Sequence, residues 1–149
     1  MPRFETVRRV PFTPDQMFSI VADIEKYPLF LPLCESLKVT SRQESGPETQ
    51  LIATMGIGYK SIHEKFTTKV LLQPHYKTIH VSHLEGPFRY LENHWQFQSE
   101  EDKTTSVHFK LEYEFQSRLF AILMGGVFDR AFRHFADTFE QRAQAVYGS

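Results

Sequence analysis

The sequence is poor in the residues that build covalent cross-links and dense metal sites. It has a single cysteine, Cys34, which excludes an internal disulfide and favours a reducing compartment. Among its seven histidines, His80 and His83 are three apart on a predicted strand and therefore point to opposite faces. Neither a Cys-x-x-Cys pair nor a helical His-x-x-x-His pair occurs. The spacing predicts no metal site.

The chain also lacks a strong charge imbalance and a long apolar run. Its 17 Lys and Arg residues stand against 18 Asp and Glu residues, for a formal net charge of -1, which is not typical of a DNA-binding protein. No apolar run reaches the length of a membrane span, and residues 1–5 lack the apolar segment of a secretory signal. Gly-rich phosphate loops and the G-x-S-x-G motif are absent. We expect a cytoplasmic protein that requires no cofactor.

Aromatic residues are abundant, and many of them recur at helical spacing near the C-terminus. With 41% hydrophobic and 23% charged residues, the chain fits one globular domain over residues 1–149. Residues 117–147 predict one long helix, because phenylalanines separated by three, four and eight positions share a helical face. These residues are Phe120, Phe128, Phe132, Phe135 and Phe139.

A short strand over residues 2–10 and a helix are expected at the start of the chain. Thr13 is a good N-cap, Pro14 suits the first helical position, and Gln16 completes a capping box. Pro28 should end this helix just before it. The next residues, 27–34, are too rich in proline for a regular helix and too apolar for an ordinary loop. They either plug the end of the core or form a lid over a pocket.

Six strands of period two should follow, separated by polar or Gly-Pro turns. The turns are expected at residues 43–48, 59–60, 73–75, 86–87 and 100–103. Short turns between consecutive strands indicate an antiparallel meander. The sequence therefore predicts an α+β fold in which a curved antiparallel sheet of about seven strands wraps round the long C-terminal helix, with a short helix after the first strand. The inward face of strand 76–84 stays open, because its polarity is weak.

Polar residues fall at inward positions of two predicted strands. In the strand after residue 60, alternation places Glu64 and Thr68 on the apolar side. A buried carboxylate needs a partner or water, so Glu64 faces either a cavity or the solvent at the sheet rim. Asn93 lies among inward-facing aromatic residues, and its amide needs a hydrogen-bond network, a ligand or water.

The first half of the long helix differs from the second. Residues 119–127 are apolar on every side, which is unusual for a helix that covers a single sheet. Gly125 and Gly126 each cost about 1 kcal/mol relative to Ala inside a helix. They indicate either close approach by a backbone, ligand or second chain, or a helix break. We expect a gate or docking surface here, while the second half is ordinary core.

Residues 21–34, with the sequence VADIEKYPLFLPLC, are similar to the signature of the coenzyme Q-binding family. The order of elements resembles the helix-grip fold of START-like lipid-binding and polyketide cyclase-like domains, over essentially the whole chain. The resemblance implies a cavity between sheet and helix that holds ubiquinone or a related isoprenoid lipid, in a carrier or chaperone that supports cellular respiration. It implies no reaction. The chain starts close to its first strand without an Arg- and Ser-rich presequence, so we expect a bacterial member.

The candidate site residues follow from this picture, although each apolar one is also compatible with a simple packed core. The expected cavity lining consists of Phe30, Leu31, Met55, Glu64, Phe66, Leu91, Asn93, Trp95, Phe109, Leu111, Met124, Phe128 and Phe132. The expected gate or docking surface consists of Tyr27, Pro28, Pro32, Phe120, Leu123, Gly125, Gly126 and Val127.

Two other functions remain open. One branch of the family is described as a ribosome-association toxin, and binding ribosomal subunits would need a basic surface. The candidates are scattered: Arg8, Arg9, Lys60, Arg89, Arg130, Arg133 and His134. A cyclase- or hydratase-like enzyme would use Glu64 or His83 as a general base. A carrier would bind a small hydrophobic ligand and touch a membrane surface transiently, peripheral to the inner membrane; the oligomeric state stays open.

Overall fold

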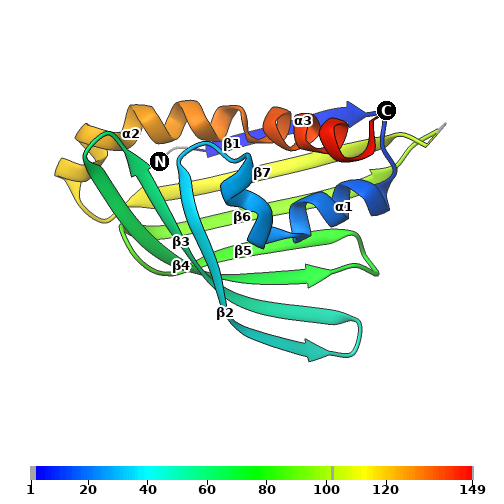
Figure 1. Ribbon diagram of the computed structural model, residues 1–149, viewed down its shortest axis with the longest axis horizontal. Coiled ribbons are helices and arrows are strands. Elements are labelled where there is room, and N and C mark those ends of the chain that lie inside the picture. The colour runs from blue at the N-terminus through cyan, green and yellow to red at the C-terminus, as the bar shows by residue number, and fades with distance from the viewer. Residues whose placement is uncertain (1–2, 102, 149) are drawn as a thin grey trace.

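Seven antiparallel strands form one continuous sheet, and the helices lie along its inner face in this computed structural model of residues 3–101 and 103–148 (Figure 1). The strand order is β1-β7-β6-β5-β4-β3-β2, so β1 and β2 are the edges. The elements are β1 (Arg3–Val10), α1 (Pro14–Ala22), the 3₁₀ helix η1 (Ile24–Leu29), β2 (Cys34–Ser45), β3 (Glu48–Tyr59), β4 (Ile62–Gln73), β5 (Thr78–Glu85), β6 (Phe88–Ser99), β7 (Thr105–Phe115), α2 (Arg118–Arg133) and α3 (Phe135–Tyr147). The predicted fold class is confirmed.

The capping box of α1 forms as expected, but the helix ends earlier than predicted. The Thr13 hydroxyl accepts from the Gln16 backbone N–H at 3.1 Å, and the Gln16 side chain accepts from the Thr13 N–H at 2.9 Å. Asp23, at φ -83° and ψ 67°, leaves the helical region and ends α1 at Ala22. The chain then continues as η1, which contains Pro28, because a short 3₁₀ helix tolerates the missing N–H.

The predicted single C-terminal helix is wrong in one respect, because the chain forms two helices. His134, at φ -106° and ψ 7°, separates α2 from α3, and its N–H bonds back to the Ala131 carbonyl. The break lets the two helices follow the curved sheet separately (Figure 1). Thus α2 packs on β7, whereas α3 packs on α1 and β1. Helical periodicity alone cannot detect a break that keeps the aromatic stripe facing the sheet.

The strand alternation is largely as predicted, and the structure shows which face of β5 points inward, a point that the sequence left undecided. Ile79 and Val81 of β5 point inward, and His80 points outward. In β1, Val7 is 62% exposed on the outer face of the sheet. Pro2, the first residue of the predicted strand, and residue 102 of the predicted turn lie outside the described residues.

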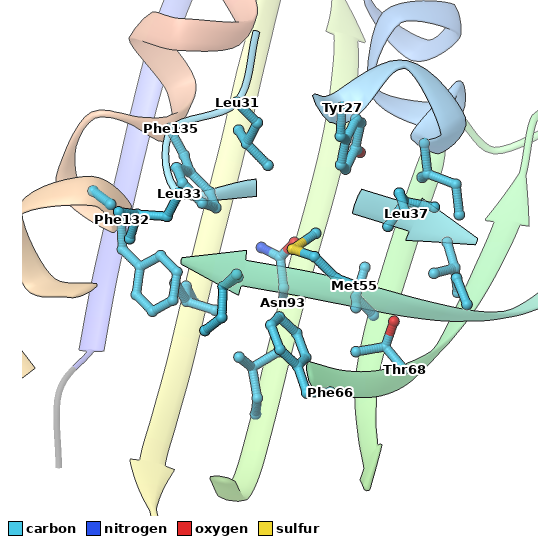
Figure 2. Close-up of a pocket in the computed structure, with 18 of the residues that line it drawn as sticks. Tyr27, Leu31, Leu33, Leu37, Met55, Phe66, Thr68, Asn93, Phe132 and Phe135 are labelled. Atoms are coloured by element: carbon cyan, nitrogen blue, oxygen red, sulfur yellow. The ribbon is translucent and has the colours of Figure 1, made fainter. Parts of the chain in front are cut away.

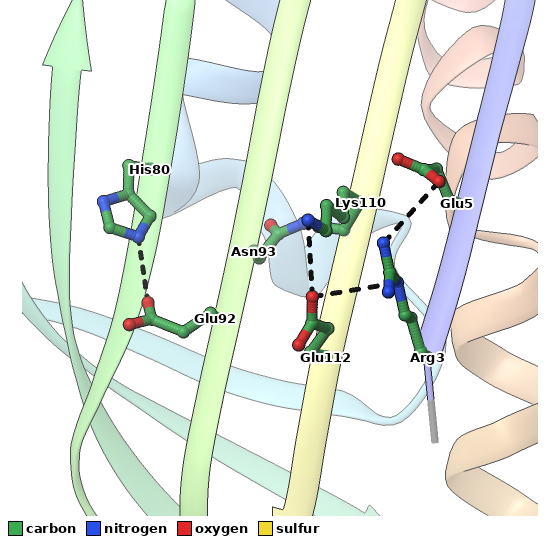
Figure 3. A network of polar contacts seen from close by, with 7 residues as sticks. All are labelled: Arg3, Glu5, His80, Glu92, Asn93, Lys110 and Glu112. Atoms are coloured by element: carbon green, nitrogen blue, oxygen red, sulfur yellow. Dashed lines mark hydrogen bonds and ion pairs between the residues drawn. The ribbon is translucent and has the colours of Figure 1, made fainter. Parts of the chain in front are cut away.

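The two faces of the sheet differ sharply in chemistry. On the outer face, Glu112 pairs with Arg3 at 3.8 Å and with Lys110 at 3.4 Å, and His80 bonds Glu92 at 2.9 Å (Figure 3). The inner face is aromatic and buried under α2 and α3. The apolar face of the sheet therefore lies between the sheet and the helices.

Candidate functional site

A cavity of about 100 Å³ lies between the inner face of the sheet, the segment around η1 and the C-terminal helices (Figure 2). Met55, Phe66, Thr68 and Asn93 reach it from the sheet. Within residues 3–101 and 103–148, every lining side chain is uncharged. The lining consists of Ile24, Tyr27, Leu31, Pro32, Leu33, Leu37, Ala53, Met55, Ile57, Phe66, Thr68, Val70, Ile79, Val81, Leu91, Asn93, Trp95, Leu111, Phe128, Ala131, Phe132, Phe135 and Phe139.

Most of the residues predicted to line a cavity do so in the structure. They are Leu31, Met55, Phe66, Leu91, Asn93, Trp95, Leu111, Phe128 and Phe132, with Tyr27 and Pro32 from the predicted gate. The sheet contributes them from inward positions of four strands, and the helices contribute the second half of the aromatic stripe. Sequence-distant positions thus converge because sheet pleat and helix period both point them inward.

Two predicted lining residues belong to the packed core instead. Phe109 is only 2% exposed and packs against Trp95 and Phe135, with ring centroids 4.7 and 6.4 Å away, so these two rings bury it in the core. Phe30 packs against Tyr27 and Phe139 at 5.8 and 5.4 Å, and the guanidinium of Arg142 lies 5.1 Å from its ring. Its ring is therefore held at the outside of the cavity.

Two others, Glu64 and Met124, line a separate narrow hollow with Phe120. Three residues are common to this hollow and the cavity: Leu33, Ile57 and Phe128. Glu64 lies near the start of β4 and is half-buried, which places it towards the end of the sheet rather than in the cavity. The hollow extends the apolar lining from the cavity towards the first half of α2.

The first half of α2 exposes large apolar side chains, as its sequence had indicated. Leu119, Ile122 and Leu123 are 66%, 73% and 60% exposed. Leu123 and Leu119 border a groove that also contains Phe120 and Lys65. This patch of Leu119, Ile122 and Leu123, called the α2 patch below, adjoins the hollow through Phe120.

Two of the four interpretations of the paired glycines are wrong. A Cβ atom added to Gly125 or Gly126 would meet no atom of the described chain within 4 Å, and α2 continues through both residues. They therefore mark neither a close approach by the chain's own backbone nor a helix break, while a contact with a ligand or a second chain stays a prediction. Their flank of α2 borders a shallow open groove rather than a packed element. Val127 is half-buried against the core one helical turn after Leu123, and Pro28 lies in η1.

Polar groups in the cavity are few and neutral. The Asn93 amide nitrogen donates to the Lys110 carbonyl at 3.0 Å, and its oxygen accepts from the Trp95 indole N–H at 2.8 Å. Thr68 is 8% exposed, and none of the hydrogen bonds found in the described part of the chain involves its hydroxyl. The Tyr27 hydroxyl donates to the Val21 carbonyl, and burial raises its pKa. The cavity therefore offers hydrogen bonds but no charge.

None of the three reactive side chains Cys34, Glu64 and His83 lines the cavity. Burial raises the pKa of Cys34 to about 11, which keeps it a thiol, as expected for a structural cysteine. His83 lies between Phe66 and Phe88, with its Nε2 buried and without a hydrogen-bond partner, and burial lowers its pKa. Among the described residues, no cluster of three or more His, Cys, Asp or Glu side chains is arranged to hold a metal ion.

Several residues that line the cavity were not predicted from the sequence. Thr68 was recognisable from its inward position but carried no apolar signal. Ile79 and Val81 required the face of β5 to be known. The remaining ones, such as Ala131, are small or generic apolar residues whose position depends on how the elements pack.

Residues 10–140 match the family model described as "Polyketide cyclase / dehydrase and lipid transport". The chain belongs to this family. Two curated relatives resemble it along most of its length. Ribosome association toxin RatA of Vibrio cholerae is 32% identical over 139 residues, which cover 93% of each chain. The mitochondrial coenzyme Q-binding protein COQ10 of Dictyostelium discoideum is 29% identical, over 97% of this chain and 70% of that protein.

Solved structures of the family share the fold. The solution structure of an 18 kDa protein from Caulobacter crescentus is 34% identical over 100% of both chains, with a TM-score of 0.79. The Zhui aromatase/cyclase from Streptomyces sp. R1128 has a TM-score of 0.78 over 96% of this chain and 93% of its own, at 13% identity, a similarity of fold alone. The expected START-like, helix-grip assignment and the resemblance to coenzyme Q-binding proteins are confirmed. None of the helices in the described ranges is both long and apolar enough to traverse a membrane.

Proposed function

We propose that this protein binds ubiquinone or a related isoprenoid lipid in the cavity between the sheet and α2–α3, and carries it in support of respiration. The observation that carries the proposal is the uncharged lining of that cavity among the described residues, whose polar groups are the Asn93 amide, the Thr68 and Tyr27 hydroxyls and the Trp95 indole N–H. Each CH₂ group of a lipid buried there contributes about 0.8 kcal/mol. The coenzyme Q-binding relative and the family's description as lipid transport support the ligand class.

The cavity has to enlarge to hold such a ligand. Its volume is about 100 Å³, whereas an apolar cavity of about 150 Å³ accommodates a single benzene ring.

The two C-terminal helices are restrained unequally. In α3, Asp137 and Glu140 each accept from Arg8 of β1 at 3.0 Å. The first half of α2 instead exposes the α2 patch, so we propose that α2 swings about His134 to admit the ligand.

We also propose that the ligand is exchanged at a membrane surface through the α2 patch. Leu119, Ile122 and Leu123 would insert among lipids, where their exposed area is stabilised. The hollow beside Phe120 connects this patch to the cavity lining. A hydrophobic ligand would then pass between membrane and cavity without crossing water.

The proposal is tested on purified protein by extraction with organic solvent and by titration with a short-tail ubiquinone. Trp95 is the single tryptophan and lines the cavity, so bound quinone should quench its fluorescence. Ala131→Leu fills part of the cavity and should lower the quinone affinity measured by Trp95 quenching about tenfold or more. Ala121→Leu lies on the same helix but outside the cavity lining, and should leave quenching unchanged.

Two results would count against the proposal. The first is an extract free of isoprenoid lipid together with no saturable quenching of Trp95. The second is equal quenching in Ala131→Leu and Ala121→Leu, which would place the quinone elsewhere on the surface.

The second candidate is a ribosome-associated toxin, and the 32% identity with RatA favours it. The basic side chains that such a function would use are mostly engaged with acids. Arg9 lies 3.9 Å from Glu100, and Arg133 bonds Asp129 at 2.9 Å. Co-sedimentation with ribosomal subunits at low salt tests this candidate, because contacts to phosphate strengthen as salt falls.

We propose no reaction for the protein. The cyclase relative supports the fold alone, and neither Glu64 nor His83 lines the cavity. Replacement of both residues should leave quinone binding unchanged, and turnover lost with that double variant would argue for an enzyme instead.

A further inference from the structure

Leu33 lies at a corner of the chain where a leucine is unusual. Residues Leu31 to Cys34 form a turn in which the Cys34 N–H donates to the Leu31 carbonyl at 3.2 Å. Leu33 is the third residue of this turn and has a φ of 70°. With Pro32 at the second position, these features match a type II turn, whose third residue is usually glycine or asparagine. A leucine is disfavoured there by a factor of roughly 5–30 relative to glycine.

The side chain of Leu33 borders two spaces at once. It lines the cavity, which it reaches together with Leu31 from the same segment (Figure 2), and it also lines the narrow hollow beside Phe120. Among the described residues, Ile57 and Phe128 are the other two that line both spaces. The three side chains of Leu33, Ile57 and Phe128 therefore mark the place where the hollow meets the cavity, called the junction below.

The three side chains of the junction are held with different firmness. Ile57 is 6% exposed, and its strand pairs on both sides, with Cys34 of β2 and Glu64 of β4. Phe128 is 2% exposed, and its ring centroid lies within 6.3 Å of those of four other aromatic rings. Leu33 is only half-buried and lies on the strained turn. It is therefore the side chain of the junction that moves at the lowest cost.

The swing proposed for α2 opens the hollow more than it opens the junction. Phe120 lies 14 residues from the pivot at His134 and Phe128 lies 6, which correspond to about 21 and 9 Å along the helix. A rotation about His134 therefore moves Phe120 more than twice as far as Phe128. A ligand that has entered the hollow still meets the junction.

We propose that Leu33 is the gating residue of the ligand path: its side chain closes the junction, and a ligand reaches the cavity only when that side chain turns aside. The inference rests on the proposed function and specifies the step that limits loading of the cavity. It gives the strained turn a role, since strained residues cluster at ligand clamps and switch regions. The Gly58 N–H bonds the Leu33 carbonyl at 2.9 Å, which holds the backbone in place while the side chain turns.

The experiment is stopped-flow mixing with a short-tail ubiquinone, in which quenching of Trp95 reports the association rate. A gate that is open a tenth of the time or less slows association about tenfold or more, so Leu33→Ala should raise the rate by that factor. Leu33→Met restores a side chain of similar volume and should return the rate to near the wild-type value. Leu29→Ala changes a side chain that is 69% exposed in the neighbouring η1, and should match wild type.

Two comparisons separate a gate from a purely structural role. Leu31→Ala removes the same atoms from the cavity wall but leaves the junction filled, so its association rate should stay well below that of Leu33→Ala. In urea unfolding, Leu33→Gly should exceed Leu33→Ala in stability by roughly 5–30-fold in the unfolding equilibrium constant, because glycine alone escapes the cost of the positive φ. A structural leucine would lower the stability on replacement and leave the association rate unchanged.

Three results overturn the inference. They are association rates of Leu33→Ala and Leu33→Gly equal to that of wild type, an acceleration that Leu31→Ala reproduces in full, and a Leu33→Gly variant that is less stable than Leu33→Ala. The proposed function survives each of them as long as the wild-type protein shows saturable quenching. Absence of saturable quenching in folded wild-type protein overturns the proposed function and the inference together.

Discussion

Replacement of the α2 patch by serine should abolish membrane binding while leaving the fold intact. Leu119, Ile122 and Leu123 are 66%, 73% and 60% exposed. Complete burial of such a side chain is worth about 1.5–3 kcal/mol, so roughly two-thirds of that amount is available from each, or about 3–6 kcal/mol together. Loss of even the lower value weakens binding at least 100-fold. Because the side chains are exposed, the thermal midpoint should change little.

The surroundings of the patch predict that anionic lipids strengthen binding. Lys65 borders the same groove, Arg118 begins α2, and Lys60 lies at the β3–β4 turn beside the hollow. Each contributes about 1 kcal/mol near an anionic bilayer. Flotation with vesicles of phosphatidylcholine plus phosphatidylglycerol should therefore exceed flotation with phosphatidylcholine alone, and 1 M NaCl should remove the difference.

The control is Val7→Ser. Val7 is 62% exposed on β1, on the outer face of the sheet beside His108, so this variant should float as wild type does. Equal flotation of the triple variant and wild type would refute the docking reasoning. A triple variant that elutes as a smaller species in size-exclusion chromatography would instead identify the patch as an interface between copies of the chain.

Three further outcomes follow from single side chains. Arg8→Met removes the ion pairs that hold α3 to β1; it should cost about 1 kcal/mol or less in urea unfolding, and the cost should shrink at 1 M NaCl. Burial lowers the pKa of His83 and His94 below the ordinary value of 6.5, so these residues should not reduce the stability above pH 6.5, and the thermal midpoint should fall as the pH drops below it. His83→Gln should make this fall of the thermal midpoint less steep. An unchanged slope would contradict the role given to His83. Tyr27→Phe leaves the Val21 carbonyl without its donor and should lower the thermal midpoint by about 2–4 °C, with quinone quenching retained.

The fold was predictable because its signals are local. Alternation assigned the faces of β4, β6 and β7, and the capping box at Thr13 located the start of α1. These patterns depend on side-chain direction within a single element. The position of the break at His134 did not follow from them, because both helices keep their aromatic residues towards the sheet.

The set of residues that line the cavity was only partly predictable from the sequence. Leu111 and Phe109 are neighbouring inward positions of β7, yet Leu111 lines the cavity and Phe109 is buried against Trp95 and Phe135. Sequence pattern assigns both to the inner face equally. Which of the two borders the cavity depends on how side chains from other strands and helices pack against them. For the same reason, the sequence left several explanations for Gly125 and Gly126, and only the structure shows that they border an open groove and meet no other atom of the described chain.

The sequence by itself determined the order of the elements, the apolar inner face of the sheet and the exposed apolar start of α2, since each depends on spacing along one segment. The tertiary structure alone decided that the cavity is small and uncharged and that the Asn93 amide in its wall bonds to Lys110 and Trp95. The physical reason is that cavity volume and hydrogen-bond direction are set by residues from several strands and helices at once.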